Sequence, residues 1–403
     1  MTSEQFKQID ETRLRTGYGV KWGSLEQDVI GAWVADMDYG IPPAVRKKVI
    51  DVTQSQDFGY PYWSDGDPVV HAFEDRMQRR YQWNPQSERT RIFTDLIQIL
   101  QIVIEHATKP GDGIAIHIPC YPPFLASIER SGRRVIPLPM VNSDKGWVFS
   151  TDNLAQTLRD QQCTMLVVVN PHNPTGRVFT ISELHALSNV AEELDITVLA
   201  DEIHADLTFS SHTHIPFASL SNMAATRTIT ATSATKAFNI AGMRCAVAHF
   251  GSSRVWNLLE KEPLDYFGTP SILSRVATLA AWNESDEWLA ELLKQLKSNR
   301  QLIAEWVETS GVDPDYRSPE ATYLSWIDFT NSPLNQNNPS VDILNLGRVF
   351  LSKGEEFSRH SSVYTTSFAR LNFATSEANL QEIFKRLDIA LQLAAEKNAK
   401  GAW

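Results

Sequence analysis

Residues 165–169 read MLVVV, and NPHNPTG follows directly at positions 170–176. A short run in which every residue is apolar is typical of a parallel strand buried on both faces of its sheet. The polar residues after it predict a loop at the carboxyl end of that strand. Ligands of open α/β sheets bind beyond these ends. The stretch therefore predicts both the class of the fold and the edge of the sheet at which to look for a site.

The same rhythm continues along the middle of the chain. Residues 180–194 predict a helix, because apolar residues recur on one face and Thr180 and Glu183 have the spacing of a capping box. Further strands are predicted at residues 114–118, 196–200 and 227–231. Strands that alternate with helices indicate an α/β fold, in which a mostly parallel sheet carries helices on both faces.

The pattern changes after the run at residues 245–250. The elements predicted beyond it are a helix at 284–310, strands at 323–329 and 370–373, and a terminal helix from Asn379, as its cap, to about residue 395. Together they describe a smaller α+β domain. We therefore expect an N-terminal segment, residues 1–44, packed with this small domain, then a large domain, residues 45–285, and the small domain, residues 286–403.

Composition excludes several classes of function. The chain has 403 residues, enough for two or three domains, and a net charge of -11 from 37 basic and 48 acidic residues. This balance argues against nucleic acid and anionic membranes as partners. The three cysteines are far apart, which excludes a disulfide framework and a CxxC metal site. With no leader pattern and no apolar stretch long enough to span a bilayer, we expect a cytoplasmic protein without a metal site.

Three predicted strands end in polar clusters about one strand–helix unit apart. The residues in these clusters are Asn173, Asp201, His204, Ser233, Thr235 and Lys236. Each alone is compatible with an ordinary loop. Three aligned clusters favour convergence on one site, because the carboxyl ends of parallel strands meet at one edge of the sheet.

The residue types in these clusters suit one kind of ligand. A lysine can form an imine with an aldehyde, and a carboxylate such as Asp201 can keep a pyridine nitrogen protonated. Serine and threonine hydroxyls with the nearby Arg244 can hold a phosphate. Aldehyde, pyridine and phosphate together describe pyridoxal 5′-phosphate, whose ring accepts electrons from carbanions.

Several motifs carry a family resemblance. NPHNPTG at 170–176, DEIH at 201–204 and SATKAFNIAGMR at 233–244 resemble the signatures of fold-type I pyridoxal-phosphate enzymes in the class I/II aminotransferase superfamily. With WVADMDYGIPP at 33–43 and FGYPYW at 58–63, the chain looks like the MalY/PatB-type cystathionine β-lyases, which are carbon–sulfur lyases. The resemblance runs from about residue 33 to 373. It implies an aspartate-aminotransferase-like large domain with a seven-stranded type of sheet.

The resemblance assigns roles around the cofactor ring. It implies that Lys236 holds the cofactor and removes the Cα proton of the substrate, and that Asp201 pairs with the pyridine nitrogen. Asn173 and His204 would hydrogen-bond the ring oxygen O3′. Tyr121 would stack on the ring face. Lys236, Asp201 and Tyr121 are thus the expected catalytic residues.

The resemblance also predicts where the phosphate and the substrate bind. Its phosphate ligands would be Ser233, Thr235, Arg244 and the backbone N–H groups of Leu96 and Ile97 at a helix start. Tyr60 would reach the phosphate from a neighbouring subunit, which implies a homodimer with shared sites. Asp95 departs from the Gly- or Ser-containing turn usual there, and as an anion it would repel the phosphate unless it caps the helix and faces away.

The α-carboxylate of an amino-acid substrate would bind Arg370 through a bidentate fork. Asn173, Trp33 and Ala35 would also face the substrate, although Trp33 and Ala35 are as well explained by simple packing. The implied reaction is β-elimination from L-cystathionine or a related L-cysteine S-conjugate, giving pyruvate, ammonia and a thiol. The alternatives are transamination to a 2-oxo acid, which the same residues serve, and a binding or regulatory protein that keeps the fold.

Overall fold

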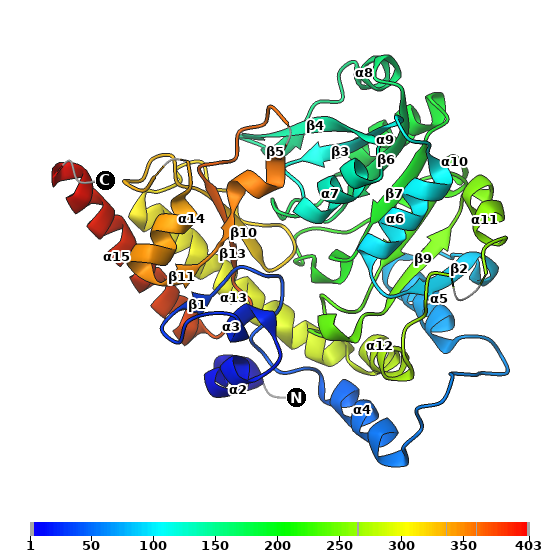
Figure 1. Cartoon of the computed structure of the whole chain (residues 1–403), viewed down its shortest axis with the longest axis horizontal. Coiled ribbons are helices and arrows are strands. Elements are labelled where there is room, and N and C mark those ends of the chain that lie inside the picture. Colours follow the sequence, from blue (N-terminus) through cyan, green and yellow to red (C-terminus); the bar gives the residue numbers. More distant parts are fainter. Residues whose placement is uncertain (1–3, 264–265, 336, 360, 401–403) are drawn as a thin grey trace.

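The computed structural model describes residues 4–263, 266–335, 337–359 and 361–400. Its centre is an eight-stranded sheet in the order β2-β9-β8-β7-β6-β3-β4-β5 (Figure 1). The strands are β2 (Thr90–Phe93), β3 (Gly113–Ile118), β4 (Arg134–Ser143), β5 (Gly146–Phe149), β6 (Cys163–Val169), β7 (Thr197–Asp201), β8 (Thr228–Thr232) and β9 (Ala246–Phe250). β9 pairs antiparallel with both β2 and β8, and β5 pairs antiparallel with β4, whereas the other neighbouring strands pair parallel. The predicted α/β class with a mostly parallel sheet is confirmed, and β5, which turns back from β4, adds one strand to the seven expected.

The apolar run at 165–169 packs against hydrophobic residues on both faces of the sheet. Met165, Val167 and Val169 point into a core that they share with one group of helices. Leu166 and Val168 point into a second core on the opposite face. The first group comprises α6 (Leu96–Ala107), α7 (Pro122–Arg130) and α11 (Ser253–Leu259), and the second α8 (Leu154–Asp160), α9 (Ile181–Glu193) and α10 (Asn222–Ala225). A strand with no polar face is therefore stable only between these two layers.

The predicted helix ends are partly right. The capping box at α9 is present, since the Thr180 side chain accepts from the N–H of Glu183 and the Glu183 side chain accepts from that of Thr180. The predicted cap of the terminal helix is wrong. α15 spans Glu377–Lys400, and Ser376 caps it by accepting the N–H of Leu380 at its carbonyl and that of Asn379 at its hydroxyl. A serine one turn earlier satisfies these donors, so Asn379 lies inside the helix.

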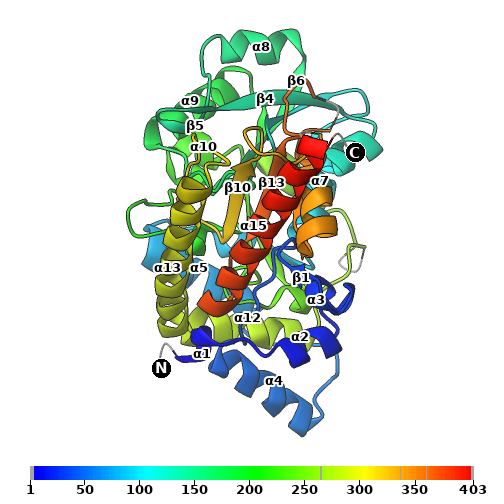
Figure 2. The ribbon, with the colours of Figure 1, turned by 90° about the vertical axis from the view of Figure 1, so that its left-hand side faces the viewer.

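The C-terminal elements form an α+β arrangement beside the large sheet. Its strands are β10 (Leu324–Asp328), β12 (Ser352–Lys353) and β13 (Phe368–Asn372), which pair antiparallel in the order β10-β13-β12. Helices α12 (Ile272–Glu284) and α13 (Asp286–Ser310) meet at Ser285, and α14 (Pro339–Asp342) precedes β11 (Val349–Phe350). α13 and α15 lie side by side (Figure 2), with the rings of Trp306 and Phe384 stacked 5.4 Å apart.

The N-terminal segment packs against these C-terminal elements. It holds α1 (Glu4–Lys7), α2 (Glu11–Thr16), α3 (Val20–Gly23) and β1 (Ile30–Gly31). β1 pairs parallel with β11, and Phe6 lies 5.4 Å from the ring of Trp288. The division of the chain at residues 44 and 285 stays a prediction, which these contacts support.

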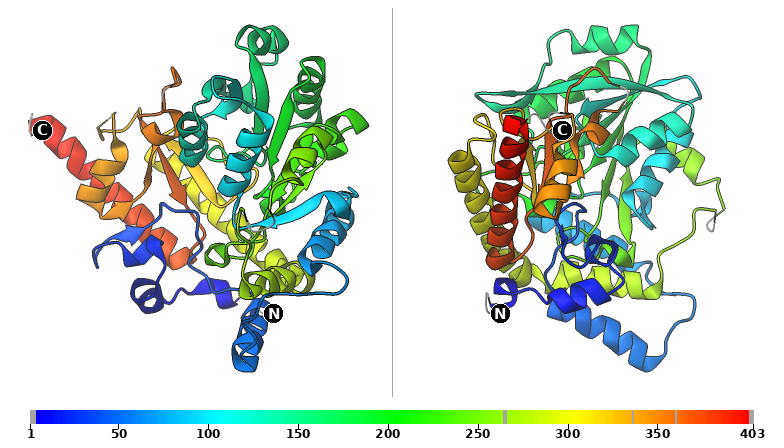
Figure 3. Two further views of the ribbon diagram at one scale, coloured as in Figure 1. Left: turned by 45° about the vertical axis from the view of Figure 1, so that its right-hand side comes forward. Right: turned by 60° about the vertical axis from the view of Figure 1, so that its left-hand side comes forward.

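Helix α4 (Pro43–Ser55) projects from the rest of the chain and leads into a connecting segment, residues 56–67, before α5 (Pro68–Tyr81) (Figures 1 and 3). Three aromatic side chains of this segment are exposed: Phe58, Tyr60 and Tyr62. Among the residues that the structure describes, no helix combines the length and the apolar character that crossing a bilayer requires.

Candidate functional site

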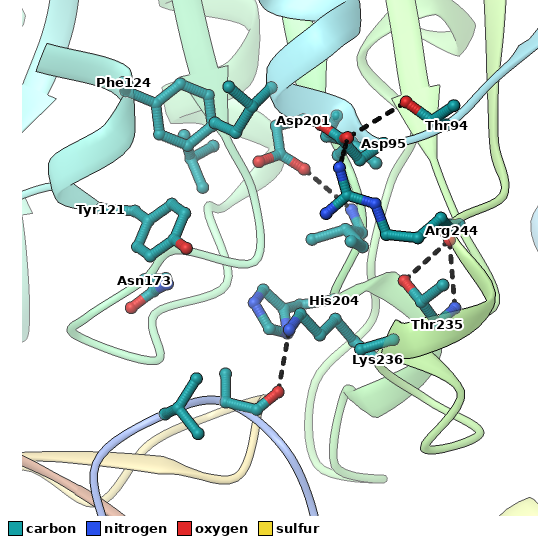
Figure 4. Close-up of a pocket in the computed structure, with 18 of the residues that line it drawn as sticks. Thr94, Asp95, Tyr121, Phe124, Asn173, Asp201, His204, Thr235, Lys236 and Arg244 are labelled. Carbon is teal, nitrogen blue, oxygen red and sulfur yellow. Dashed lines mark hydrogen bonds and ion pairs between the residues drawn. The ribbon is translucent and has the colours of Figure 1, made fainter. Parts of the chain in front are cut away.

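A cavity of about 200 Å³ lies at the carboxyl ends of β6, β7 and β8 (Figure 4). The residues of all three predicted clusters line it: Asn173, Asp201, His204, Ser233, Thr235 and Lys236. Ala35, Leu96, Ile97, Tyr121, Arg244 and Arg370 line it as well. Residues that are far apart in the sequence are thus brought together as the strand pattern predicts.

The loop after β6 turns sharply to present Asn173. The N–H of Gly176 donates to the carbonyl of His172 at 2.7 Å, and the side-chain oxygen of Asn170 accepts from the N–H of Phe179 at 2.9 Å. Gly176 has a φ of 69°, and a Cβ there would collide with Pro319. Only glycine satisfies both constraints. The loop is therefore fixed by backbone geometry at the point where it enters the site.

Lys236 follows β8 and is partly buried. Its Nζ donates to the carbonyl oxygen of Ala35 at 2.8 Å (Figure 4), and the hydroxyl of Tyr323 donates to the same oxygen at 2.9 Å. Burial lowers the pKa of Lys236, and Arg370 lowers it further, whereas Asp36 and Asp201 act in the opposite direction. A lowered pKa increases the fraction of uncharged amine at neutral pH, which is the form that acts as a base or nucleophile.

Asp201 ends β7 and is buried. One carboxylate oxygen accepts from the N–H of Ile203 at 3.1 Å. Burial raises the pKa of Asp201 to about 7; Glu202 adds to the rise, and Lys236 opposes it. The charge of Asp201 at neutral pH therefore depends on what lies beside it, and a cationic group there favours the carboxylate.

His204 stays neutral at neutral pH, because burial lowers its pKa to about 3 and the charges of Lys236 and Arg370 act in the same direction. Its Nδ1 is buried and has no hydrogen-bond partner among the described residues. A buried nitrogen without a partner in a cavity wall is suited to a polar atom of a ligand.

Arg370 reaches the cavity from β13, the middle strand of the small sheet. One guanidinium nitrogen donates to Asn173 Oδ1 at 2.9 Å, and another donates to the Trp33 carbonyl at 2.9 Å and to Ser352 Oγ at 3.2 Å. The guanidinium carbon, Cζ, lies 5.0 Å from the centre of the Phe357 ring. Burial lowers the pKa of Arg370 to about 10, so it remains a cation at neutral pH. The guanidinium is thus held in a fixed orientation before any ligand arrives.

The other end of the cavity is formed by the start of α6 and by Arg244. Asp95 caps this helix, because its Oδ1 accepts from the N–H of Gln98 at 2.9 Å. Its side chain does not face away from the cavity. Its Oδ2 makes an ion pair with Arg244, and the hydroxyl of Thr94 donates to the same oxygen at 3.2 Å. A carboxylate has two oxygens, and the cap uses only one of them.

Two residues of the predicted site lie differently from the others. Tyr60, in the connecting segment, is fully exposed and is not part of the cavity wall. Trp33 meets Arg370 through its backbone carbonyl, whereas its indole packs 5.1 Å from Phe350 and donates to the carbonyl of Lys21 at 3.2 Å. Simple packing therefore accounts for the Trp33 side chain.

Sequence reasoning missed the contacts that the small sheet makes with the site. Tyr323 binds the carbonyl that also holds Lys236, while Ser352 and Phe357 hold Arg370. These three residues stand in no motif, and no sequence signal marked them. Phe124 also lines the cavity beside Tyr121, with the two rings 6.1 Å apart (Figure 4). It follows Tyr121 in CYPPF, so proximity to that motif was the available signal.

Comparison with known proteins places this site in a family. Residues 28–387 match the model of the family described as aminotransferase class I and II. The chain belongs to this family. The family resemblance drawn from the motifs is thereby confirmed.

Relatives within the class I and II aminotransferase family are similar over nearly the whole chain. The cystathionine beta-lyase of Corynebacterium glutamicum is 32% identical over 386 residues, which are 95% of this chain and 99% of the relative. A putative PLP-dependent beta-cystathionase from Corynebacterium diphtheriae is similar in structure, with a TM-score of 0.86, 29% identity and coverage of 96% and 99%. Cystalysin of Treponema denticola, whose structure contains pyridoxal 5′-phosphate, gives a TM-score of 0.88 at 25% identity, covering 97% and 99%.

Proposed function

We propose that the protein is a pyridoxal 5′-phosphate-dependent carbon–sulfur β-lyase, which cleaves L-cystathionine or a related L-cysteine S-conjugate to pyruvate, ammonia and a thiol. One observation carries the proposal. A single cavity joins the amine of Lys236, the buried carboxyl of Asp201 and the oriented guanidinium of Arg370. The chain that forms this cavity has near-full-length relatives named cystathionine beta-lyase.

The residues of the cavity fit the proposed cofactor. A protonated pyridine nitrogen beside Asp201 would favour its carboxylate and so offset the burial that raises its pKa to about 7. The partnerless Nδ1 of His204 and the amide of Asn173 would bind the ring oxygen. Ser233, Thr235, Arg244 and the first N–H groups of α6 would hold the phosphate. When bound, the cofactor supplies a ring that accepts electron density from the substrate Cα.

The protein's own groups bind the substrate and move its proton. Arg370 would receive the α-carboxylate, and its bonds to Asn173 and Trp33 fix its direction beforehand, which reduces the entropy lost on binding. The Lys236 amine, whose pKa is lowered, would take the Cα proton as general base. The carbon–sulfur bond then breaks and its electron pair leaves with the sulfur. Water completes the reaction by releasing ammonia and pyruvate.

A homodimer with shared sites is part of the proposal. The exposed aromatic side chains of the connecting segment, Phe58, Tyr60 and Tyr62, support it, because clustered apolar side chains on a surface mark interaction sites. Tyr60 would reach the phosphate of the neighbouring subunit, which explains why it lies outside the cavity of its own chain. A cytoplasmic location also belongs to the proposal.

Transamination is the second candidate, and the description of the matching family favours it. One assay separates the two reactions. Purified protein with bound cofactor is given L-cystathionine without any 2-oxo acid, and pyruvate and thiol are measured. We expect both products in equal amounts. The lyase proposal fails if pyruvate is absent and amine transfer appears only after a 2-oxo acid is added.

A further inference from the structure

Asp95 occupies an unusual position for an anion. Its Oδ1 caps α6 and its Oδ2 is paired with Arg244, and both residues line the cavity at the end proposed for the phosphate (Figure 4). Their side chains are 26% and 63% exposed, so neither is locked in the protein interior. The cation proposed to bind the phosphate therefore already has an anionic partner within the chain.

We propose that Asp95 competes with the phosphate of the cofactor for Arg244, so that the cofactor is held more weakly and exchanges more readily than it would without this carboxylate. The inference rests on the proposed cofactor site. It goes further in assigning to Asp95 a role as a positioning residue that sets cofactor affinity.

The charges at this end of the cavity support competition. Of the cations that line the cavity, Lys236 binds the Ala35 carbonyl and Arg370 binds Asn173, at the opposite end from Asp95. Arg244 alone is left to balance a phosphate of roughly −2 together with the charge of Asp95. Without the Asp95 carboxylate, the same guanidinium would be free to form a bidentate pair with phosphate oxygens.

The helix start provides less compensation than a simple N-terminus would. The cap by Asp95 already uses the N–H of Gln98, and the Asp95 carbonyl accepts from Ile99 at 3.2 Å. The N–H groups of Leu96 and Ile97 remain for a phosphate. The partial positive charge of the helix end is then shared between two anions instead of acting on one.

The test separates the charge of Asp95 from its function as a helix cap. Asp95→Asn removes the charge, and asparagine is as good an N-cap as aspartate. Asp95→Ser is a second variant that keeps a capping oxygen. Dissociation constants for pyridoxal 5′-phosphate are measured on the full-length chain after removal of its cofactor, by absorbance titration, for the wild type, each variant, Arg244→Gln and the double variant Asp95→Asn/Arg244→Gln.

We expect both Asp95 variants to bind pyridoxal 5′-phosphate about tenfold more tightly than the wild type, a difference of roughly 1.4 kcal/mol. Pyridoxal, which lacks the phosphate, should bind them and the wild type equally. In the Arg244→Gln background, the gain from Asp95→Asn should shrink to less than about threefold, because no cation is left to compete for.

Unchanged or weaker binding by both Asp95 variants overturns the inference. A full tenfold gain that persists without Arg244 also overturns it, because simple repulsion would then explain the effect. If Arg244→Gln leaves the affinity for pyridoxal 5′-phosphate unaltered, the proposed phosphate site itself fails, which is a different result from the failure of Asp95 alone.

Discussion

The two ends of the cavity manage charge in opposite ways. At the ring end, Lys236, Asp201 and His204 are withdrawn from water. Burial raises the pKa of Asp201 and lowers the pKa of Lys236 and His204, and each shift favours the uncharged form of the side chain. At the phosphate end, Asp95 and Arg244 stay partly exposed and neutralise each other as an ion pair. Burial therefore favours the uncharged forms of the groups at the ring end, whereas the partly exposed groups at the phosphate end form an ion pair.

The largest effect is expected at the ring end. Lys236→Ala removes the proposed base and should lower the rate of pyruvate release by roughly 10³-fold or more, because a positioned general base contributes about 10²- to 10⁴-fold and the amine also holds the cofactor. Pyruvate release from L-cystathionine measures it. Lys47→Ala, in an exposed ion pair on α4, is the control and should be unchanged. The site assignment fails if the Lys236 variant keeps the cofactor absorbance of the wild type near neutral pH.

Arg370 joins the ring end to the small sheet. Arg370→Lys keeps the charge but loses the planar fork, so kcat/KM should fall roughly 10- to 100-fold, as expected for one charged hydrogen bond. Steady-state kinetics with L-cystathionine provide the values. Arg348→Lys, in exposed ion pairs of the same part of the chain, should stay within about twofold of the wild type. Equal losses in both variants would contradict a specific role for Arg370.

A smaller effect is expected from Tyr60, proposed to complete the phosphate end from a second subunit. Tyr60→Phe removes one hydroxyl and should weaken pyridoxal 5′-phosphate binding about fivefold, the value of a single hydrogen bond. Tyr62→Phe, which changes another exposed tyrosine of the same segment, is the matched control. Light scattering on both variants should give the mass of a dimer. A monomeric wild type would rule out the shared site.

The smallest effect concerns the stability of the chain without cofactor. The pKa of Asp201 is raised to about 7 by burial, while the unfolded chain ionises near 3.8. The folded chain thus binds an extra proton between these values, and its stability falls as pH rises from about 4 to 7 and is level above. Asp201→Asn abolishes this dependence. Relative to the variant, the wild type should lose on the order of 2–4 °C in melting temperature between pH 4.5 and 7.5.

Added pyridoxal 5′-phosphate is the control for that measurement. A protonated ring nitrogen beside Asp201 would favour its carboxylate. The loss in melting temperature of the wild type between pH 4.5 and 7.5, relative to Asp201→Asn, should therefore become smaller. If, without cofactor, the melting temperatures of the wild type and Asp201→Asn differ by the same amount at pH 4.5 and at pH 7.5, burial of Asp201 has no such effect.

The sequence predicts the ring end better than the phosphate end, for a physical reason. Fully apolar strands such as residues 165–169 indicate the fold class, and the loop after β6 and the last residue of β7 present Asn173 and Asp201 at one edge of the sheet. The direction of Asp95 is a matter of side-chain geometry, because a capping carboxylate keeps a second oxygen free to turn either way. The positions of Arg244 and Thr94, which both contact this oxygen, decide it.

The sequence also did not predict the contacts that residues of the small sheet make with the site. Tyr323 and Ser352 contact site residues only because β10 and β12 lie in the same sheet as β13, and no local pattern records that pairing. The cap of α15 shows the same limit at short range. Ser376 and Asn379 are both good capping residues, and the geometry of the preceding chain decides between them.

The Ala35 carbonyl described above has a consequence for the whole chain. It accepts from Lys236, which follows the large sheet, and from Tyr323, beside the small one, while Ala35 itself belongs to the N-terminal segment. Three parts of the chain therefore meet at one oxygen atom. When the lysine amine forms a bond elsewhere, this oxygen loses one of its two donors. The bonding state of the amine therefore changes one of the contacts that hold the N-terminal segment against the rest of the chain.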